Sequence, residues 1–302
     1  MKLITLILIT LSILACTNKK AQNTNSEPQD TIQNQQSTIN SNENCPPVLR
    51  ERAEPMVLSR MAKNGEGDSF LIPNSSFLIH KEVLLGKFNP AEDTNYVVIP
   101  DHMSTYKGLY CHREAFNAYL AMRDSALREG ITLTIISATR TFDRQLQIWN
   151  RKWNSFKTRD TRHETRDTRH ETRDVRLSTD IEKVRSIMRY SSMPGTSRHH
   201  WGTDIDFISA ETDYWTHGEG LRIYKWLCAN AHKFGFFQPY TDDPARTGYA
   251  EERWHWSYAP LSKPYLEAYR QKITAKDITG FSGSYLVDSL GIIQSHVFGI
   301  TE

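Results

Sequence analysis

The 302-residue sequence predicts an α+β fold, a small antiparallel sheet with helices packed on one of its faces. Segments that are short and β-branched or alternating are typical of strands, and they occupy residues 131–136, 203–207 and 254–256. Segments with apolar residues at three- and four-residue steps are typical of helices, and they occupy residues 112–129, 178–190 and 221–234. Together these patterns indicate one sizeable core.

The first 15 residues have the pattern of a secretory signal peptide, with Lys2 followed by an apolar run from Leu3 to Leu14. That run is too short to span a bilayer as a permanent helix. Its end, Ile-Leu-Ala-Cys, is similar to a bacterial lipoprotein box, which predicts cleavage before Cys16 and a lipid on its sulfur. An ordinary signal peptide is the alternative. We expect an exported bacterial lipoprotein, anchored in the membrane and facing the periplasm or cell wall.

Residues 16–46 consist mostly of Asn, Gln, Thr and Ser with almost no apolar side chains. Such a segment cannot bury enough surface to offset its ordering entropy, so we expect a flexible tether behind the lipid anchor. Its root-mean-square reach is roughly 30 Å. The formal net charge of +2 includes no concentrated basic face, and nucleic-acid binding is therefore not expected.

Within the folded part, a helix is predicted over His112–Glu129, which Gly130 ends. The β-branched strand Ile131–Ile136 follows, and Arg140 lies just beyond its end, before a second helix that begins near Asp143. A cation at a strand-to-helix turn is expected to point into a cleft.

The folded domain is expected to span residues 47–275 and to contain one charged insertion. From Thr158 to Asp174 the sequence repeats Thr-Arg-Asp-Thr-Arg-His-Glu with a period of seven. No face of such a helix is apolar, so we expect residues 158–176 to be a duplicated surface helix or loop. Binding to an anionic surface is the alternative. The C-terminal extension, residues 276–302, has enough apolar side chains to pack on the domain.

Three cysteines follow the predicted lipidation site: Cys45, Cys111 and Cys228. None has C-x-x-C spacing, so metal binding by thiolates is not expected. Export permits a disulfide, with Cys111 and Cys228 as the favoured pair, but both also fit helical patterns as small buried residues.

Two short motifs contain candidate metal ligands. They are Ser-Arg-His-His-Trp-Gly-Thr-Asp-Ile-Asp at 197–206 and Glu-Arg-Trp-His-Trp at 252–256. The candidate ligands are His199, Asp206 and His255. Two imidazoles and one carboxylate, with the fourth position left to water, form an open zinc site of the catalytic kind. Glu252 supplies the general base that activates this water, which predicts a zinc-dependent hydrolase.

Local patterns indicate how these side chains would meet. The strand over Thr203–Phe207 places Asp204 and Asp206 on one face. Gly202 permits the turn that brings in the preceding histidine. A bend near Arg253 would let Glu252 approach the metal.

Several neighbours compete for these roles. His200 could replace His199 as a ligand, and Glu251 could replace Glu252 as the base, although the motif spacing favours the first assignments. Asp204 could bind the metal or face water, but a hydrogen bond to a ligand is the favoured role.

The motifs resemble those of the VanY-type D-alanyl-D-alanine carboxypeptidases, zinc peptidases with the hedgehog/DD-peptidase fold. The family patterns S-x-H-x-x-G-x-A-x-D and E-x-W-H match residues 197–206 and 252–255. A third pattern, S-G-Y-R-S-x-x-x-Q, is similar to residues 137–145, and the resemblance covers roughly residues 105 to 270. One departure is Asp204, where the family usually has alanine.

The resemblance implies further roles. Arg140 would stabilise the oxyanion of the tetrahedral intermediate, and Ser197 and Gln145 would contact the substrate. That substrate would be a peptidoglycan stem peptide that loses its C-terminal D-alanine. D,D- and L,D-cleavage, and carboxypeptidase and endopeptidase action, remain open. Alternatives are a cell-wall-binding lipoprotein with a non-catalytic zinc site, or an adhesin that uses the arginine repeat.

Overall fold

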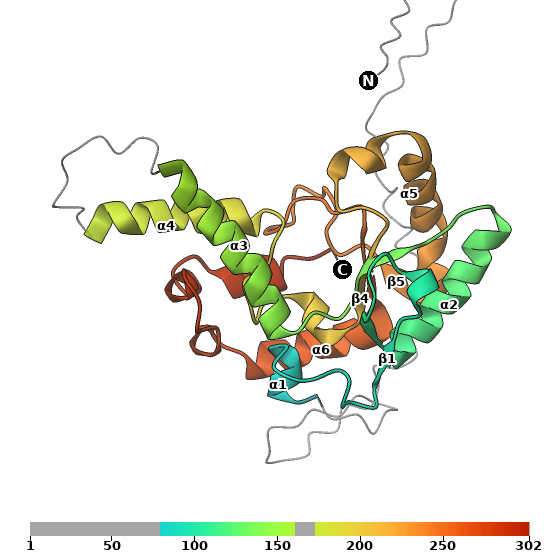
Figure 1. Cartoon of the computed structure of the whole chain (residues 1–302), viewed down its shortest axis with the longest axis horizontal. Helices are drawn as coiled ribbons and strands as arrows, with labels where there is room; N and C mark the ends of the chain where they lie inside the picture. The colour runs from blue at the N-terminus through green and yellow to red at the C-terminus, as the bar shows by residue number, and fades with distance from the viewer. Residues whose placement is uncertain (1–78, 161–172, 302) are drawn as a thin grey trace, which may run out of the picture. The chain divides into compact units, whose positions relative to one another are not determined.

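The computed structural model describes residues 79–160 and 173–301 (Figure 1). The predicted signal peptide, Cys16, the tether and most of the heptad repeat lie outside these described residues. Within the described ranges, every helix is too short or too polar to cross a bilayer.

A four-stranded antiparallel sheet forms the centre of the fold. Its strand order is β3-β4-β6-β5, with bounds Ile135–Ser137, Asp204–Phe207, His255–Tyr258 and Phe236–Phe237. A separate antiparallel pair joins β1, Tyr96–Val98, to β2, Tyr110–His112. The predicted α+β class, with a small antiparallel sheet, is confirmed.

Six α-helices surround the sheets in the described residues. They are α1 (Lys81–Leu84), α2 (Arg113–Arg128), α3 (Phe142–Asp160), α4 (Arg173–Met188), α5 (Gly218–Asn230) and α6 (Ala259–Lys272). The sequence pattern placed α2 and α3 within two residues of their starts. The helix expected over residues 221–234 is α5 followed by a 3₁₀ turn, Ala231–Phe234, and Gly235 ends it with a φ of 82°.

The strand expected over residues 131–136 is shorter than predicted. Only Ile135–Ser137 pairs with β4, whereas Ile131 donates its N–H to Ala126 at the end of α2. The partner strand ends at Phe207, and Ile208 has a left-handed φ of 62°. Residues 131–134 are therefore not paired as a strand with any of the described residues, although Ile131 and Leu133 are buried.

One face of the sheet is covered by α2 and α5, which lie together on one side of β4 (Figure 1). Ile205 and Phe207 point into this apolar cluster, and Trp254 and Trp256 pack in it as well. Alternation along β4 therefore leaves Asp204 and Asp206 for the opposite face.

A second apolar cluster joins α1, α3, α4 and α6 to the C-terminal extension. Leu286, Val287, Ile292 and Val297 of the extension are buried in it. Helices thus pack on both sides of β4, which the sequence pattern did not indicate (Figure 1).

Cys111 is a free, buried thiol that donates a hydrogen bond to the carbonyl oxygen of Gly202, 3.3 Å away. The disulfide between Cys111 and Cys228 that the sequence left open is therefore not formed.

Candidate metal centre

Two central strands place the candidate site on one face of the sheet. In the β4–β6 register, Asp206 lies opposite His255 and Asp204 lies opposite Ser257. Alternate residues of a strand point to the same face, so these four side chains gather together.

A 3₁₀ turn, Arg198–Trp201, brings His199 to the same place. Gly202 ends this turn with a φ of 70°, a backbone conformation that side chains disfavour. A Cβ atom there would lie 2.6 Å from a ring carbon of Tyr96 and 2.7 Å from Oγ1 of Thr139. The turn that presents His199 therefore requires glycine for two independent reasons.

Replacing Gly202 with alanine is expected to destabilise the fold by about 1–3 kcal/mol because the new methyl group overpacks a buried site. Chemical denaturation would measure this loss. Gly130→Ala is the matched control, since Gly130 also has a φ of 70° but has nothing within 4 Å of the added Cβ. Equal losses in the two variants would mean that backbone conformation, and not the contact with Tyr96, sets the requirement.

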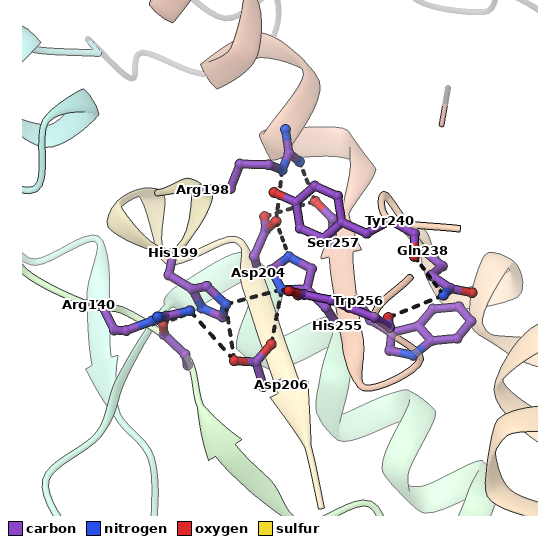
Figure 2. Close-up of polar contacts among 12 residues, drawn as sticks. Arg140, Arg198, His199, Asp204, Asp206, Gln238, Tyr240, His255, Trp256 and Ser257 are labelled. Carbon is purple, nitrogen blue, oxygen red and sulfur yellow. Dashed lines mark hydrogen bonds and ion pairs between the residues drawn. The ribbon is translucent and has the colours of Figure 1, made fainter. Parts of the chain in front are cut away.

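His199, Asp206 and His255 form a compact triad of possible metal ligands, with one donor atom each within 4.8 Å of the others (Figure 2). Nε2 of His199 lies 3.2 Å from Nδ1 of His255 and 3.2 Å from Oδ2 of Asp206. Nδ1 of His255 lies 3.0 Å from Oδ1 of Asp206. The three donors predicted from the sequence thus converge on one point.

In each imidazole ring, the nitrogen that points away from the other two candidate ligands donates a hydrogen bond to a protein oxygen. Nδ1 of His199 donates to the carbonyl oxygen of Ala138 at 2.8 Å, and Nε2 of His255 donates to Oδ2 of Asp204 at 2.9 Å. In the neutral rings, the lone pairs of Nε2 in His199 and Nδ1 in His255 therefore face each other. This arrangement is typical of imidazoles that share a cation.

The donor set fits a divalent ion such as zinc. Ligands about 2.0–2.2 Å from a tetrahedral zinc are separated from one another by roughly 3.3 Å, close to the separations between these donors. Oδ1 of Asp206 is buried, and no donor in the described part of the chain is aligned to hydrogen-bond with it. Three protein donors leave one tetrahedral position for another ligand.

Burial and neighbouring charges shift the pKa values of the triad. Burial lowers the pKa of His199, and the charge of Arg140 lowers it further. Burial also disfavours the charged form of His255, but the neighbouring carboxylates of Asp204 and Asp206 outweigh it and raise the pKa of His255 to about 9.

Glu252 reaches the triad because the chain turns between it and β6. The N–H of His255 donates to the carbonyl oxygen of Glu252, and Oε2 of Glu252 lies 3.5 Å from Nδ1 of His255. Burial raises the pKa of Glu252 to about 7, and a general base is most effective when its pKa is near the working pH. Glu251 instead hydrogen-bonds to Arg253 and Tyr224, so the geometry favours Glu252 for this position.

Arg140 also lies next to Asp206, with its Nη2 3.7 Å from Oδ2 of the carboxylate. The side chain of Arg140 is 20% exposed. Gln145 accepts a hydrogen bond from Nη1 of Arg140 at 3.0 Å and donates to the carbonyl oxygen of Ser192 at 2.7 Å. The oxygen of the Gln145 amide thus holds Arg140, while the nitrogen of the amide is fixed by Ser192. Ser197 is buried at the start of the 3₁₀ turn, and its Oγ has no hydrogen-bond partner among the described residues.

His200 has a different role from its neighbour. Its Nδ1 donates to the carbonyl oxygen of Arg140 at 2.6 Å, and its Nε2 accepts from the N–H of Gly195 at 3.0 Å. Burial lowers its pKa to about 3, so the ring stays neutral. His200 therefore ties the loop to Arg140, and its nitrogens are not available to a metal.

Sequence reasoning missed two side chains that support the site. Arg198 is 2% exposed and contacts Asp204, and the ring of Tyr240 packs 4.8 Å from that of His255 (Figure 2). The sequence favoured a hydrogen bond between Asp204 and one of the ligands, and the structure shows that this ligand is His255. Alternation along β6 could have placed Ser257 on the face of His255, but nothing in the pattern indicates that an arginine is buried.

The chain is similar in sequence to known proteins. The sequence model of the VanY family, described as D-alanyl-D-alanine carboxypeptidase, matches residues 108–261. The chain is 28% identical over 139 residues to a D-alanyl-D-alanine carboxypeptidase of Enterococcus faecalis, covering 46% of this chain and 44% of that protein. It is 26% identical over 251 residues to YodJ of Bacillus subtilis, covering 80% of this chain and 81% of that protein.

Among solved structures, the chain is similar to VanYB in complex with D-alanine-D-alanine. The sequence identity is 22% and the TM-score is 0.41, over 61% of this chain and 87% of that one. The chain spans less than half the length of the Enterococcus faecalis relative.

Proposed function

The chain belongs to the VanY family of D-alanyl-D-alanine carboxypeptidases, whose sequence model covers just over half of it, and we propose that it is a zinc-dependent carboxypeptidase. Its proposed substrate is a peptidoglycan stem peptide, from which it removes a C-terminal D-alanine. The observation that carries the proposal is the triad of His199, Asp206 and His255 with Glu252 beside it.

His199, Asp206 and His255 would hold the zinc ion. When bound, zinc supplies a Lewis acid that polarises the scissile carbonyl and lowers the pKa of a water molecule. Glu252 accepts the proton of the attacking water and later donates it to the amine of the departing D-alanine. This role requires a carboxylate beside the triad but outside it, which is where Glu252 lies.

Arg140 supplies positive charge to the oxyanion that forms on the attacked carbonyl. Gln145 holds its Nη1, so the guanidinium is oriented before the substrate arrives. The unpartnered Oγ of Ser197 is a candidate donor to the substrate. Arg140, Asp206 and Glu252 keep side-chain exposures of 20%, 10% and 9%, so solvent reaches this side of the triad.

The N-terminal sequence supports a location close to this substrate. We propose that a lipid on Cys16 anchors the enzyme and that residues 16–46 tether it, facing the periplasm or cell wall. A tether with a reach of roughly 30 Å suits an enzyme that acts on a polymer near the membrane.

Mass spectrometry of purified tripeptide, tetrapeptide and pentapeptide stems tests the proposal. The zinc-loaded enzyme is expected to remove one D-alanine, and a chelator is expected to abolish this reaction until zinc is restored. Loss from the pentapeptide would identify D,D-cleavage, and loss from the tetrapeptide would identify L,D-cleavage. If the zinc-loaded protein binds these stems but cleaves none, the alternative of a cell-wall-binding protein is correct.

A further inference from the structure

Asp204 lies directly behind a proposed ligand, and its carboxylate is completely buried (Figure 2). Its Oδ2 accepts hydrogen bonds from Nε2 of His255 and from Nε of Arg198, each at 2.9 Å. Its Oδ1 accepts from the hydroxyls of Thr203 at 2.7 Å and Ser257 at 2.8 Å. All four lone pairs of the carboxylate are therefore used, and its orientation is fixed.

Arg198 is as buried as the carboxylate it meets. Its Nη2 donates to Ser257 at 2.7 Å, and its guanidinium lies 4.8 Å from the ring centroid of Trp201. Its Nη1 has no hydrogen-bond partner in the described part of the chain. A buried ion pair is costly to desolvate, and apolar residues of similar volume often stabilise a fold as well. A contribution to the stability of the fold therefore does not by itself explain the buried ion pair of Arg198 and Asp204.

The two proposed histidine ligands donate hydrogen bonds to acceptors of different charge. His199 donates to a neutral backbone carbonyl, that of Ala138, whereas His255 donates to a carboxylate. A carboxylate behind a ligating imidazole fixes its tautomer and ring orientation and makes the other nitrogen a stronger donor. Here that nitrogen is Nδ1 of His255, which faces Asp206.

We propose that Arg198 and Asp204 form a positioning pair that holds His255 as a strong metal donor. Asp204 fixes the proton on Nε2 of His255, and Arg198 fixes the carboxylate. The inference rests on the proposed function, since it takes His255 to be a zinc ligand.

Zinc affinity, measured by competition with a chromophoric chelator, separates this role from a structural one. Asp204→Asn removes the charge while keeping the shape, and is expected to weaken zinc binding by roughly 10- to 100-fold. Ser257→Ala is the control, since it deletes hydrogen bonds in the same buried cluster without removing the bond to His255. It is expected to lower thermal stability and to weaken zinc binding much less than Asp204→Asn does, because the charged carboxylate still bonds to His255.

The double variant Arg198→Met, Asp204→Ala removes both charges, so no unpaired charge is left buried. It is expected to fold, as followed by circular dichroism, yet to bind zinc roughly 10- to 100-fold more weakly than the wild type. Its cobalt-substituted form is expected to have an altered visible absorption spectrum, because the donor set is rearranged. The inference is overturned if this variant and Asp204→Asn bind zinc as tightly as the wild type with an unchanged cobalt spectrum. A wild-type protein that binds no zinc would instead overturn the proposed function.

Discussion

Replacing Glu252 with glutamine is expected to leave zinc binding intact and to lower kcat by roughly 10²- to 10⁴-fold. Glutamine keeps the size of the side chain but cannot accept a proton from the attacking water. Oε2 of Glu252 lies 3.5 Å from Nδ1 of His255, and Glu252 does not belong to the triad of possible ligands. The zinc content and the kcat on a stem peptide, measured on the same preparation, check both parts.

The neighbouring residue provides the control. Glu251→Gln changes an adjacent carboxylate that hydrogen-bonds to Arg253 and Tyr224, and its kcat is expected to stay close to the wild-type value. If Glu252→Gln retained full turnover while Glu251→Gln lost it, the general base would have been assigned to the wrong glutamate.

Features that depend on a pattern of neighbouring residues were predictable from the sequence. The alternation in Asp204–Phe207 correctly assigned two acids to one face, because successive residues of a strand point to opposite faces and Ile205 and Phe207 belong to the apolar cluster under α2 and α5. The glycine after the 3₁₀ turn predicted the bend that presents His199. The convergence of the ligands was predicted only because three motifs occur together in a family order, since the register that joins β4 to β6 is non-local.

Features that depend on distant parts of the chain were not predictable in this way. Apolar alternation at residues 131–134 reflects burial without strand pairing, because the neighbouring strand ends too early. Arginines are mostly exposed in proteins, so no pattern around Arg198 predicted that this side chain would be buried. The expected contact of Gln145 with substrate stays a prediction, and the sequence did not indicate that its amide bonds to Arg140 and to Ser192, since Ser192 lies in a loop far along the chain.

Replacing His199 with alanine is expected to abolish activity by removing zinc. This variant loses one of the three protein donors to zinc. The zinc affinity is therefore expected to fall by more than the roughly 100-fold that is lost when a residue hydrogen-bonded to a ligand is replaced. The remaining donors, Asp206 and His255, lie on adjacent strands and would keep their places. Zinc content after dialysis and kcat with excess zinc measure the two effects separately.

The adjacent histidine tests whether this loss is specific. His200→Gln removes a ring whose two nitrogens bond to Gly195 and to the carbonyl oxygen of Arg140, so it is expected to lower thermal stability while zinc stays bound. Both variants alter the same 3₁₀ turn, and a general disturbance of the turn would therefore affect zinc in each. Zinc lost from His200→Gln but retained by His199→Ala would show that the turn presents the other imidazole to the metal.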